Sequence, residues 1–386
     1  MKFNKWTLGL VAVGLVTWTS AARADDASAP ATVLTALSST TLSGYVDTSA
    51  QWNLGTGNAN NPPYSFGGGD KADGFNLNVV QLSLDKPLDE SEWAAGYHVD
   101  LWLGPDANAL GTVSSATTSD FAIRQAYVAL RTPIGNGIDW KIGVFDTIIG
   151  YESLSSPNNP NYTRSYGFSI EPTTHTGLLG TYKVSDMVNV SAGIANTVGP
   201  MINNRAFNGG GPFDGTEAES YKSYMGSVSL TAPTSWGWIG GSTLSAGAVN
   251  GFNVAAGANS ANYYVGATMN TPINALKVGA AYDLLDVHHA NGDAWDMAGY
   301  ASYQLTEKLS VNARGEYLDQ VNVAHVIEGT ATLQYDLWKN VISRVEFRWD
   351  HGSNGRFFGG QFVDGVASAP TRRNAYLLAA QVIYKF

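Results

Sequence analysis

The last twelve residues of the chain, AYLLAAQVIYKF (Ala375–Phe386), alternate in polarity and end on an aromatic side chain. In a β-strand successive side chains point to opposite faces, so one face here is apolar and ends in two aromatics. That face contains Leu378, Ala380, Val382, Tyr384 and Phe386. Aromatic rings at a strand end are typical of the interfacial girdle of a membrane barrel. We therefore expect this stretch to be a closing barrel strand, with a buried edge strand of a soluble domain as the alternative.

Composition narrows the class of protein. Only 14% of the 386 residues are charged, well below the roughly 25% of soluble globular chains. The mean hydropathy is nevertheless −0.10, so apolar and polar positions are interleaved rather than segregated. A net charge of −10 with no basic stripe argues against nucleic acid as a partner. The chain has no cysteine, which excludes disulfides, thiolate metal sites and cysteine nucleophiles.

The N-terminal residues have the pattern of a secretory leader. Lys2 and Lys5 precede an apolar run, and Ala22-Arg23-Ala24 offers small residues at the two positions that a signal peptidase reads. We predict a signal peptide over residues 1–24 and a short N-terminal segment over 25–39. A membrane anchor is the weaker alternative, because the apolar run is short.

Period-two alternation recurs along the rest of the chain. In VISRVEFRWD (341–350), Val345, Phe347 and Trp349 fall on one face, opposite a charged face that includes Arg344 and Glu346. The segments KLSVNARGEY (308–317) and VIEGTATLQYDL (326–337) repeat the pattern. A soluble β-sandwich gives the same alternation, so the pattern alone does not decide between a sandwich and a barrel.

The spacing of the turns favours the barrel. Sixteen candidate strands are separated by breaks that alternate between short and long, as in outer-membrane barrels with short periplasmic turns and longer outside loops. The candidates are 40–52, 75–86, 92–103, 120–132, 138–146, 168–184, 187–197, 221–232, 237–250, 261–271, 275–286, 295–305, 308–318, 326–337, 340–350 and 373–386.

Backbone hydrogen bonding explains why such a sheet must close. In hydrocarbon each unpaired N–H or C=O costs several kcal/mol, so a spanning sheet has no free edge. The first and last candidate strands must therefore pair. We predict an all-β fold: a transmembrane antiparallel β-barrel of about 16 strands over residues 40–386, with short periplasmic turns and long extracellular loops.

A barrel of this size encloses water, and the polar strand faces should line it. The predicted lumen carries both signs of charge, and arginines and acids alternate closely in the later strands. The predicted pore-lining residues are Asp100, Asp139, Lys141, Lys277, Asp283, Asp296, Arg314, Glu316, Glu328, Asp336, Arg344, Glu346 and Arg348. For any one of them, a salt-bridged wall position is the alternative to contact with a solute.

The third outside loop is the candidate constriction. The stretch TIIGYESLSSPNNPNYTRSYG (147–167) carries Glu152 and Arg164 among turn-forming residues, and it opens with Ile148 and Ile149. An exposed loop has no need of two isoleucines. We therefore expect the loop to fold into the barrel, with Glu152 facing Arg164 or a wall arginine such as Arg124. An ordinary surface loop is the alternative.

Four stretches carry a family resemblance: NLNVVQLSLDKP (76–87), AYVALRTPIGNGIDWKIGVFDTIIGYE (126–152), SSPNNPNYTRSYGFSIEP (155–172) and TTHTGLLGTYKVSDMVNVSAGIAN (173–196). Together they resemble the beta-barrel porin family of OmpL-like outer-membrane porins. The resemblance extends from about residue 40 to Phe386. It implies an outer-membrane barrel that lets small solutes pass, and it does not identify the solute.

The expected function is therefore an outer-membrane porin: a water-filled channel for passive diffusion of small hydrophilic solutes and ions in a Gram-negative-type bacterium. A closed barrel acting as an adhesin or receptor is the alternative. Expected partners are outer-membrane lipids and the barrel assembly machinery, whose recognition signal Phe386 resembles. A homotrimer is compatible with sixteen strands.

Enzymatic activity is not expected, because the chain lacks G-x-S-x-G, H-E-x-x-H and Walker patterns. His98 with Asp100 is interpreted as a hydrogen-bonded wall pair, and His288 with His289 as an outside-loop pair that binds metal only casually. No cofactor and no dedicated metal site are predicted.

Overall fold

The computed structural model describes residues 39–55, 57–112, 119–206, 218–287 and 292–386. The predicted signal peptide (1–24) lies outside these residues, as do nearly all of the predicted segment 25–39 and the pair His288 and His289. In the described part of the chain, no helix is long and apolar enough to cross a membrane.

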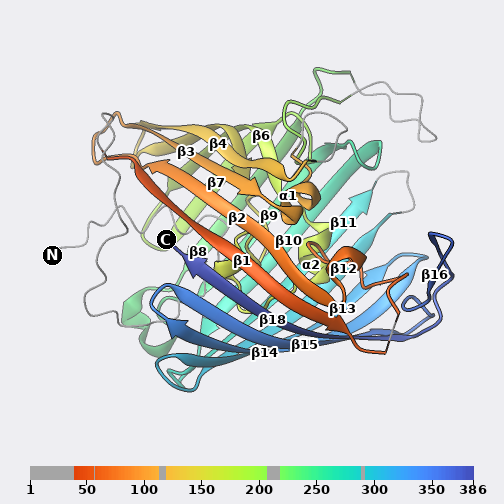
Figure 1. Ribbon diagram of the computed structural model, residues 1–386. Coiled ribbons are helices and arrows are strands. Elements are labelled where there is room, and N and C mark those ends of the chain that lie inside the picture. The colour runs from red at the N-terminus through yellow and green to blue at the C-terminus, as the bar shows by residue number, and fades with distance from the viewer. Residues whose placement is uncertain (1–38, 56, 113–118, 207–217, 288–291) are drawn as a thin grey trace.

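Sixteen antiparallel strands close into one barrel, and each pairs with its neighbours along the barrel (Figure 1). The barrel strands are β1 (Thr41–Asn53), β2 (Gly74–Lys86), β3 (Ala95–Leu103), β4 (Phe121–Thr132), β5 (Ile138–Asp146), β6 (Thr174–Lys183), β7 (Val188–Ala195), β8 (Ser223–Thr231), β9 (Thr243–Asn253), β10 (Ala258–Asn270), β11 (Leu276–Val287), β12 (Ala294–Gln304), β13 (Leu309–Gln320), β14 (Ala324–Trp338), β15 (Val341–Gly352) and β18 (Asn374–Lys385). A separate small hairpin, β16 (Phe362–Val363) with β17 (Val366–Ala367), precedes β18. The predicted fold class is confirmed.

The chain terminus takes part in closing the barrel. β18 pairs with β1 over a continuous register that starts with Lys385 opposite Tyr45. Beyond it, Gly44 and Phe386 exchange two backbone hydrogen bonds of 3.0 Å each. A side chain at Gly44 would collide with the Phe386 ring, because an added Cβ would lie 2.8 Å from it. The quoted C-terminal stretch is therefore the closing strand, paired to its last residue.

Strand β15 shows which face of the wall is which. Val345 and Phe347, on the outer face, are 52% and 43% exposed. Arg348, on the inner face, is 0% exposed. Exposed apolar groups and buried charges are the reverse of a soluble sheet, and they suit a wall with lipid outside and a polar interior. This is the sidedness that the alternation predicted.

A β-bulge explains why the sequence near residue 120 alternates poorly. Across β3 and β4, Asp100 pairs with Gln125 but Leu101 pairs with Ile123, so Arg124 is the extra residue on β4. Arg124 and Gln125 are consecutive and both buried on the inner side. A bulge re-aims side chains in this way, and here it turns an arginine into the lumen.

Two predicted strands began too early, at 168 and 237. Residues 168–173 instead belong to helix α2 (Tyr166–Ile170) and the connection that follows it. Ser165 caps this helix, since its side chain accepts a hydrogen bond from the Phe168 N–H at 3.0 Å. Residues 237–239 lie in the 3-10 helix η3 (Thr234–Ile239) and residues 240–242 in the connection to β9, and Gly237 has a φ of +69° that strands do not adopt.

The expected strict alternation of short and long connections is wrong at two places. The connection from β9 to β10 spans only residues 254–257, and that from β13 to β14 spans 321–323. In both cases the strands continue past their predicted ends, because ladder hydrogen bonds persist through residues that read as loop. These two hairpins therefore have short connections where the sequence predicted long loops.

Candidate functional site

The connection from β5 to β6, here called L3 (residues 147–173), lies inside the barrel. It contains the short turn η2 (Ser156–Asn158) and helix α2, which contacts β11, β12 and β13 from within (Figure 1). Nearly all of its side chains between residues 148 and 168 are buried. A loop buried this deeply must satisfy its backbone groups through the wall, and its contacts divide into two kinds.

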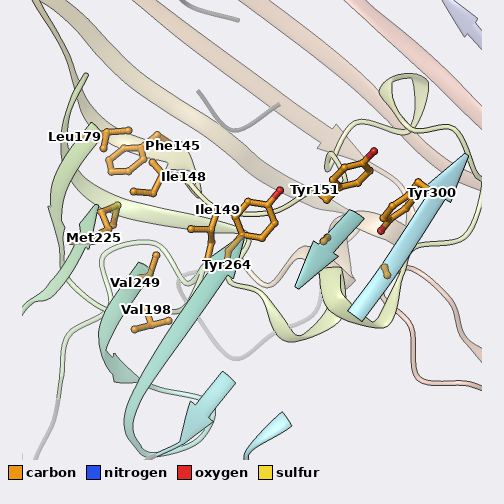
Figure 2. Close-up of a cluster of buried hydrophobic side chains, with 13 residues drawn as sticks. Phe145, Ile148, Ile149, Tyr151, Leu179, Val198, Met225, Val249, Tyr264 and Tyr300 are labelled. Atoms are coloured by element: carbon orange, nitrogen blue, oxygen red, sulfur yellow. The ribbon is translucent and has the colours of Figure 1, made fainter. Parts of the chain in front are cut away.

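The first kind is apolar. Ile148 and Ile149 pack into a cluster with inward side chains of β6 to β11 (Figure 2). These wall residues, here called the apolar wall, are Leu179, Ala195, Met225, Val249, Tyr264 and Ala281. Fully burying one isoleucine side chain contributes roughly 1.5–3 kcal/mol, which explains the two isoleucines that the loop sequence carries.

Glycines make room for this contact. An added Cβ at Gly247 would lie 2.8 Å from Ile149, and one at Gly279 would lie 1.9 Å from the Tyr151 hydroxyl. Tyr151 also stacks on Tyr300 of β12, with ring centroids 4.1 Å apart. The missing side chains therefore form recesses in the wall that accept the first part of L3.

The second kind of contact is ionic and hydrogen-bonded. It involves inward side chains of β13, β14 and β15, here called the charged wall: Arg314, Glu316, Glu328, Arg344, Glu346, Arg348 and Asp350. Arg314 donates to Glu152 at 2.9 Å and to the Thr163 carbonyl at 2.8 Å. Glu152 also accepts from Tyr300 at 3.2 Å.

Acids of the charged wall bind backbone N–H groups of L3. Glu346 accepts from the amides of Tyr162 at 2.6 Å and Thr163 at 2.9 Å. Glu316 accepts from the amide of Tyr166 at 2.7 Å. Hydrogen bonds to a charged partner are stronger than neutral ones, so these carboxylates fix the backbone of L3.

Arginines of the same wall bind L3 carbonyls. Arg344 donates to the Asn159 carbonyl at 2.5 Å, and Arg348 donates to the Arg164 carbonyl at 2.7 Å. Arg348 also pairs with Asp350 at 2.8 Å. The charged wall therefore satisfies both the donors and the acceptors of the loop backbone.

The ion-pair partner of Glu152 differs from the two residues named in the prediction. Glu152 pairs with a wall arginine, but this arginine is Arg314 rather than Arg124. Arg124 donates to Ser155 at 2.7 Å and pairs with Asp146 and Asp100. Arg164 donates to the Leu154 carbonyl at 3.1 Å, with its guanidinium over the ring of Phe168. The expected Glu152–Arg164 pair is replaced because Arg164 turns toward apolar loop residues.

The thirteen residues predicted to line the pore differ in access. Nine are buried: Asp100, Asp283, Asp296, Arg314, Glu316, Glu328, Arg344, Glu346 and Arg348. Asp139, Lys277 and Asp336 are partly exposed. Lys141 is only partly buried, and its ammonium lies 4.8 Å above the Tyr127 ring. Asp100 lies 3.1 Å from His98, the wall pair that the sequence suggested. Most of the predicted lining charges therefore contact L3 or one another.

Sequence reasoning missed a second inward segment, here called L1 (residues 57–73). Tyr64 of L1 covers Arg348, with the guanidinium 4.2 Å from its ring centre. Lys71 forms a buried ion pair with Asp106 of helix α1 (Pro105–Leu110). Burial raises the pKa of Asp106 to about 6 although Lys71 opposes the rise, so its charge persists at neutral pH. The signal in the sequence that could have indicated this inward segment was the pair of aromatic residues, Tyr64 and Phe66, in a Gly-rich loop.

Comparisons with known proteins agree on the architecture. The family described as beta-barrel porin-2, OmpL-like matches residues 39–386. The anion-selective porin from Comamonas acidovorans is 13% identical, with a TM-score of 0.58 over 90% of this chain and 99% of that chain. The outer membrane channel DcaP of Acinetobacter baumannii is 12% identical, with a TM-score of 0.58 over 90% and 97%.

A third similar structure is OmpT of Vibrio cholerae, described in a trimer form. It is 14% identical, with a TM-score of 0.53 over 90% of this chain and 99% of that chain. No curated protein matches the sequence. At these identities the structures show a shared fold.

Proposed function

This chain belongs to the OmpL-like β-barrel porin family, and on that premise we propose that L3 sets the size and charge filter of its channel. As a porin of this family, the protein forms a channel for passive diffusion across a bacterial outer membrane. The proposed cargo is small hydrophilic solutes and ions. The observation that carries the proposal is the attachment of L3 to both walls of the lumen.

The attachment of L3 to the wall limits which side chains a permeating solute can contact. Nine of the thirteen predicted lining charges are buried, so the permeating solute does not meet them. It would meet partly exposed groups instead, such as Lys141 on β5 and Lys277 on β11. We assign these two lysines, together with serine and threonine side chains of β6 to β10, as the groups that contact solute.

The cellular setting completes the proposal. The apolar outer face fits outer-membrane lipids of a Gram-negative-type bacterium, and Phe386 fits recognition by the barrel assembly machinery. A homotrimer is proposed because the similar OmpT is described in a trimer form. Residues 1–24 would direct export as a cleaved leader.

Single-channel recording in planar bilayers tests the role of L3. We expect the wild type to give conductance steps and a variant lacking residues 152–164 to give larger ones. A variant lacking residues 363–366, in the small hairpin of β16 and β17, is the matched control and should conduct like the wild type. Unchanged conductance and unchanged solute exclusion in the 152–164 deletion would refute the proposal.

A second variant covers the case in which the deletion fails to assemble. Replacing Glu346 by Gln removes the charge that holds two L3 amides and keeps the side-chain shape. It should raise conductance to a smaller extent than the deletion. A wild-type protein that inserts without any conductance step would instead support the alternative of a closed adhesin or receptor barrel.

A further inference from the structure

One contact between L3 and the wall lacks a counter-charge. Glu171, just after α2, lies within hydrogen-bonding reach of Asp283 on β11. Asp283 pairs in register with Asp296 on β12, so their Cα atoms lie directly opposite each other. Three carboxyl groups therefore meet at the end of L3, in contrast to the compensated charges of the charged wall.

Three of the carboxyl oxygens of this cluster lack hydrogen-bond donors among the described residues. Asp296 is 0% exposed, and neither of its carboxylate oxygens has a hydrogen-bond partner among the described residues. Asp283 is 3% exposed, and its Oδ1 also has no hydrogen-bond partner among the described residues. Both side chains aim at L3, since an added Cβ at Gly167 would lie 2.7 Å from Asp283 and 3.0 Å from Asp296. Buried polar groups are rarely left unpaired, so these demand a partner.

A proton is the partner that fits. Two carboxyl groups can form a hydrogen bond only when one of them is protonated. Like charges that share a buried site favour the neutral form of one member. Burial raises the pKa of Glu171 well above its usual range, and Asp283 raises it further. The described residues contain no cluster of three or more acids or histidines arranged to hold a metal ion.

The groups around the carboxyl cluster include more acidic side chains than cationic ones. The charged and titratable groups facing the cluster are Glu152 of L3, Tyr264 of β10, Arg314 and Glu316 of β13, and Glu328 of β14. Arg314 is the one cation among these groups, and it already pairs with Glu152. Deprotonation of the cluster would therefore leave negative charges in mutual repulsion across the L3–wall contact.

We propose that Glu171, Asp283 and Asp296 form a proton-held latch that keeps the α2 end of L3 against β11 and β12, so that a rise in pH releases this end and widens the channel. The latch rests on the proposed function of L3 as the filter. The proton is supplied and accepted by solvent, and no covalent bond changes.

The direction of the pH dependence follows from proton uptake. The latched state binds a proton at a pH where a solvent-exposed glutamate, with a pKa of about 4.3, has lost it. Latched protein therefore binds more protons than released protein between that pH and the raised pKa of Glu171. Within this window the ratio of latched to released protein falls about tenfold per pH unit for one proton.

Single-channel recording from pH 5 to pH 9 tests the latch. In the wild type we expect the ratio of time in the larger to time in the smaller conductance state to rise by up to about tenfold per pH unit. Glu171→Gln should remove the slope and hold the ratio at its low-pH value, because the amide stays neutral. Glu307→Gln, in the exposed turn between β12 and β13, is the matched control and should keep the slope. A flat wild-type ratio, or an unchanged slope in Glu171→Gln, would overturn the latch.

A distance measurement separates this proposal from the proposed function. The chain has no native cysteine, so spin labels at Ser169→Cys on α2 and Met297→Cys on the outer face of β12 report the position of the loop directly. The distance should lengthen between pH 5.5 and 8.5, and adding Glu171→Gln should abolish the change. A constant distance overturns the latch, whereas an unchanged conductance in the 152–164 deletion overturns the filter and the widening of the channel but leaves the pH-dependent release of α2 standing.

Discussion

The two walls of the lumen hold L3 through different interactions: apolar burial on one side, and hydrogen bonds and ion pairs on the other. The apolar wall of β6 to β11 offers small and apolar side chains and receives Ile149 and Tyr151 beside glycines. The charged wall of β13 to β15 offers arginines and acids that bind the L3 backbone at 2.5–2.9 Å. Apolar burial is non-directional, whereas hydrogen bonds require a defined geometry. The charged wall therefore decides where L3 lies, and the apolar wall contributes affinity without fixing that position.

The difference also explains why buried charges are tolerated in this lumen. Removing one partner of a buried ion pair costs far more than the pair contributes, because the other charge is left uncompensated. On the charged wall nearly every charge has a partner from L3 or a neighbouring strand. The carboxyl cluster of Glu171 with Asp283 and Asp296, on the neighbouring strands β11 and β12, contains no such counter-charge.

The largest expected effect comes from breaking the charged wall at Arg314. Arg314→Met would leave Glu152 buried without its cation and would leave Glu328 with only the more distant Arg348, at a cost of about 3–5 kcal/mol. We expect a lower temperature for the gel shift from folded to unfolded protein, and a larger single-channel conductance. Arg131→Met, at a partly exposed pair with Asp139, is the control and should cost no more than about 1 kcal/mol. Equal effects of the two substitutions would contradict the role of the charged wall.

A smaller effect is expected from filling a recess of the apolar wall. Gly279→Ala would place a methyl group 1.9 Å from the Tyr151 hydroxyl and push that side chain away from Tyr300. Overpacking of this kind costs typically about 1–3 kcal/mol. Tyrosine fluorescence and conductance should both change. Gly299→Ala on β12 is the matched control, since its nearest neighbour would be 3.9 Å away, and it should leave both unchanged.

The smallest effect is expected from removing one hydroxyl that binds the charged wall. Thr163→Val deletes the hydroxyl that donates to Glu346 at 2.6 Å and accepts from Arg314 at 3.3 Å, and it leaves the two amide donors to Glu346 in place. The expected loss is about 1 kcal/mol, measured as faster amide hydrogen exchange of residues 162–164 with unchanged barrel stability. Thr181→Val, which breaks a hydroxyl pair with Ser191 on the opposite side, should leave that exchange unaltered. Identical exchange in Thr163→Val and the wild type would show that this hydroxyl does not help the charged wall to position L3.

Much of the barrel could be predicted because its rule is local. The alternation of Val345 and Phe347 with Arg344 and Glu346 depends only on the two-residue period of a strand. The starts of β6 and β9 were missed because Ser165 and Gly237 favour local turns that compete with the ladder. The inward fold of L3 was suggested by Ile148 and Ile149, whereas L1 was missed because its aromatics lie in a loop with no periodic pattern.

The sequence by itself determined the strand count, the closure through Phe386 and which side chains face lipid, since hydrocarbon requires a paired backbone and strands alternate at every residue. Only the tertiary structure decided that Glu152 binds Arg314, that most lining charges hold L3, and that Glu171 meets two acids. These pairings depend on register between distant strands, and one extra residue, such as Arg124 in its bulge, changes which side chains meet.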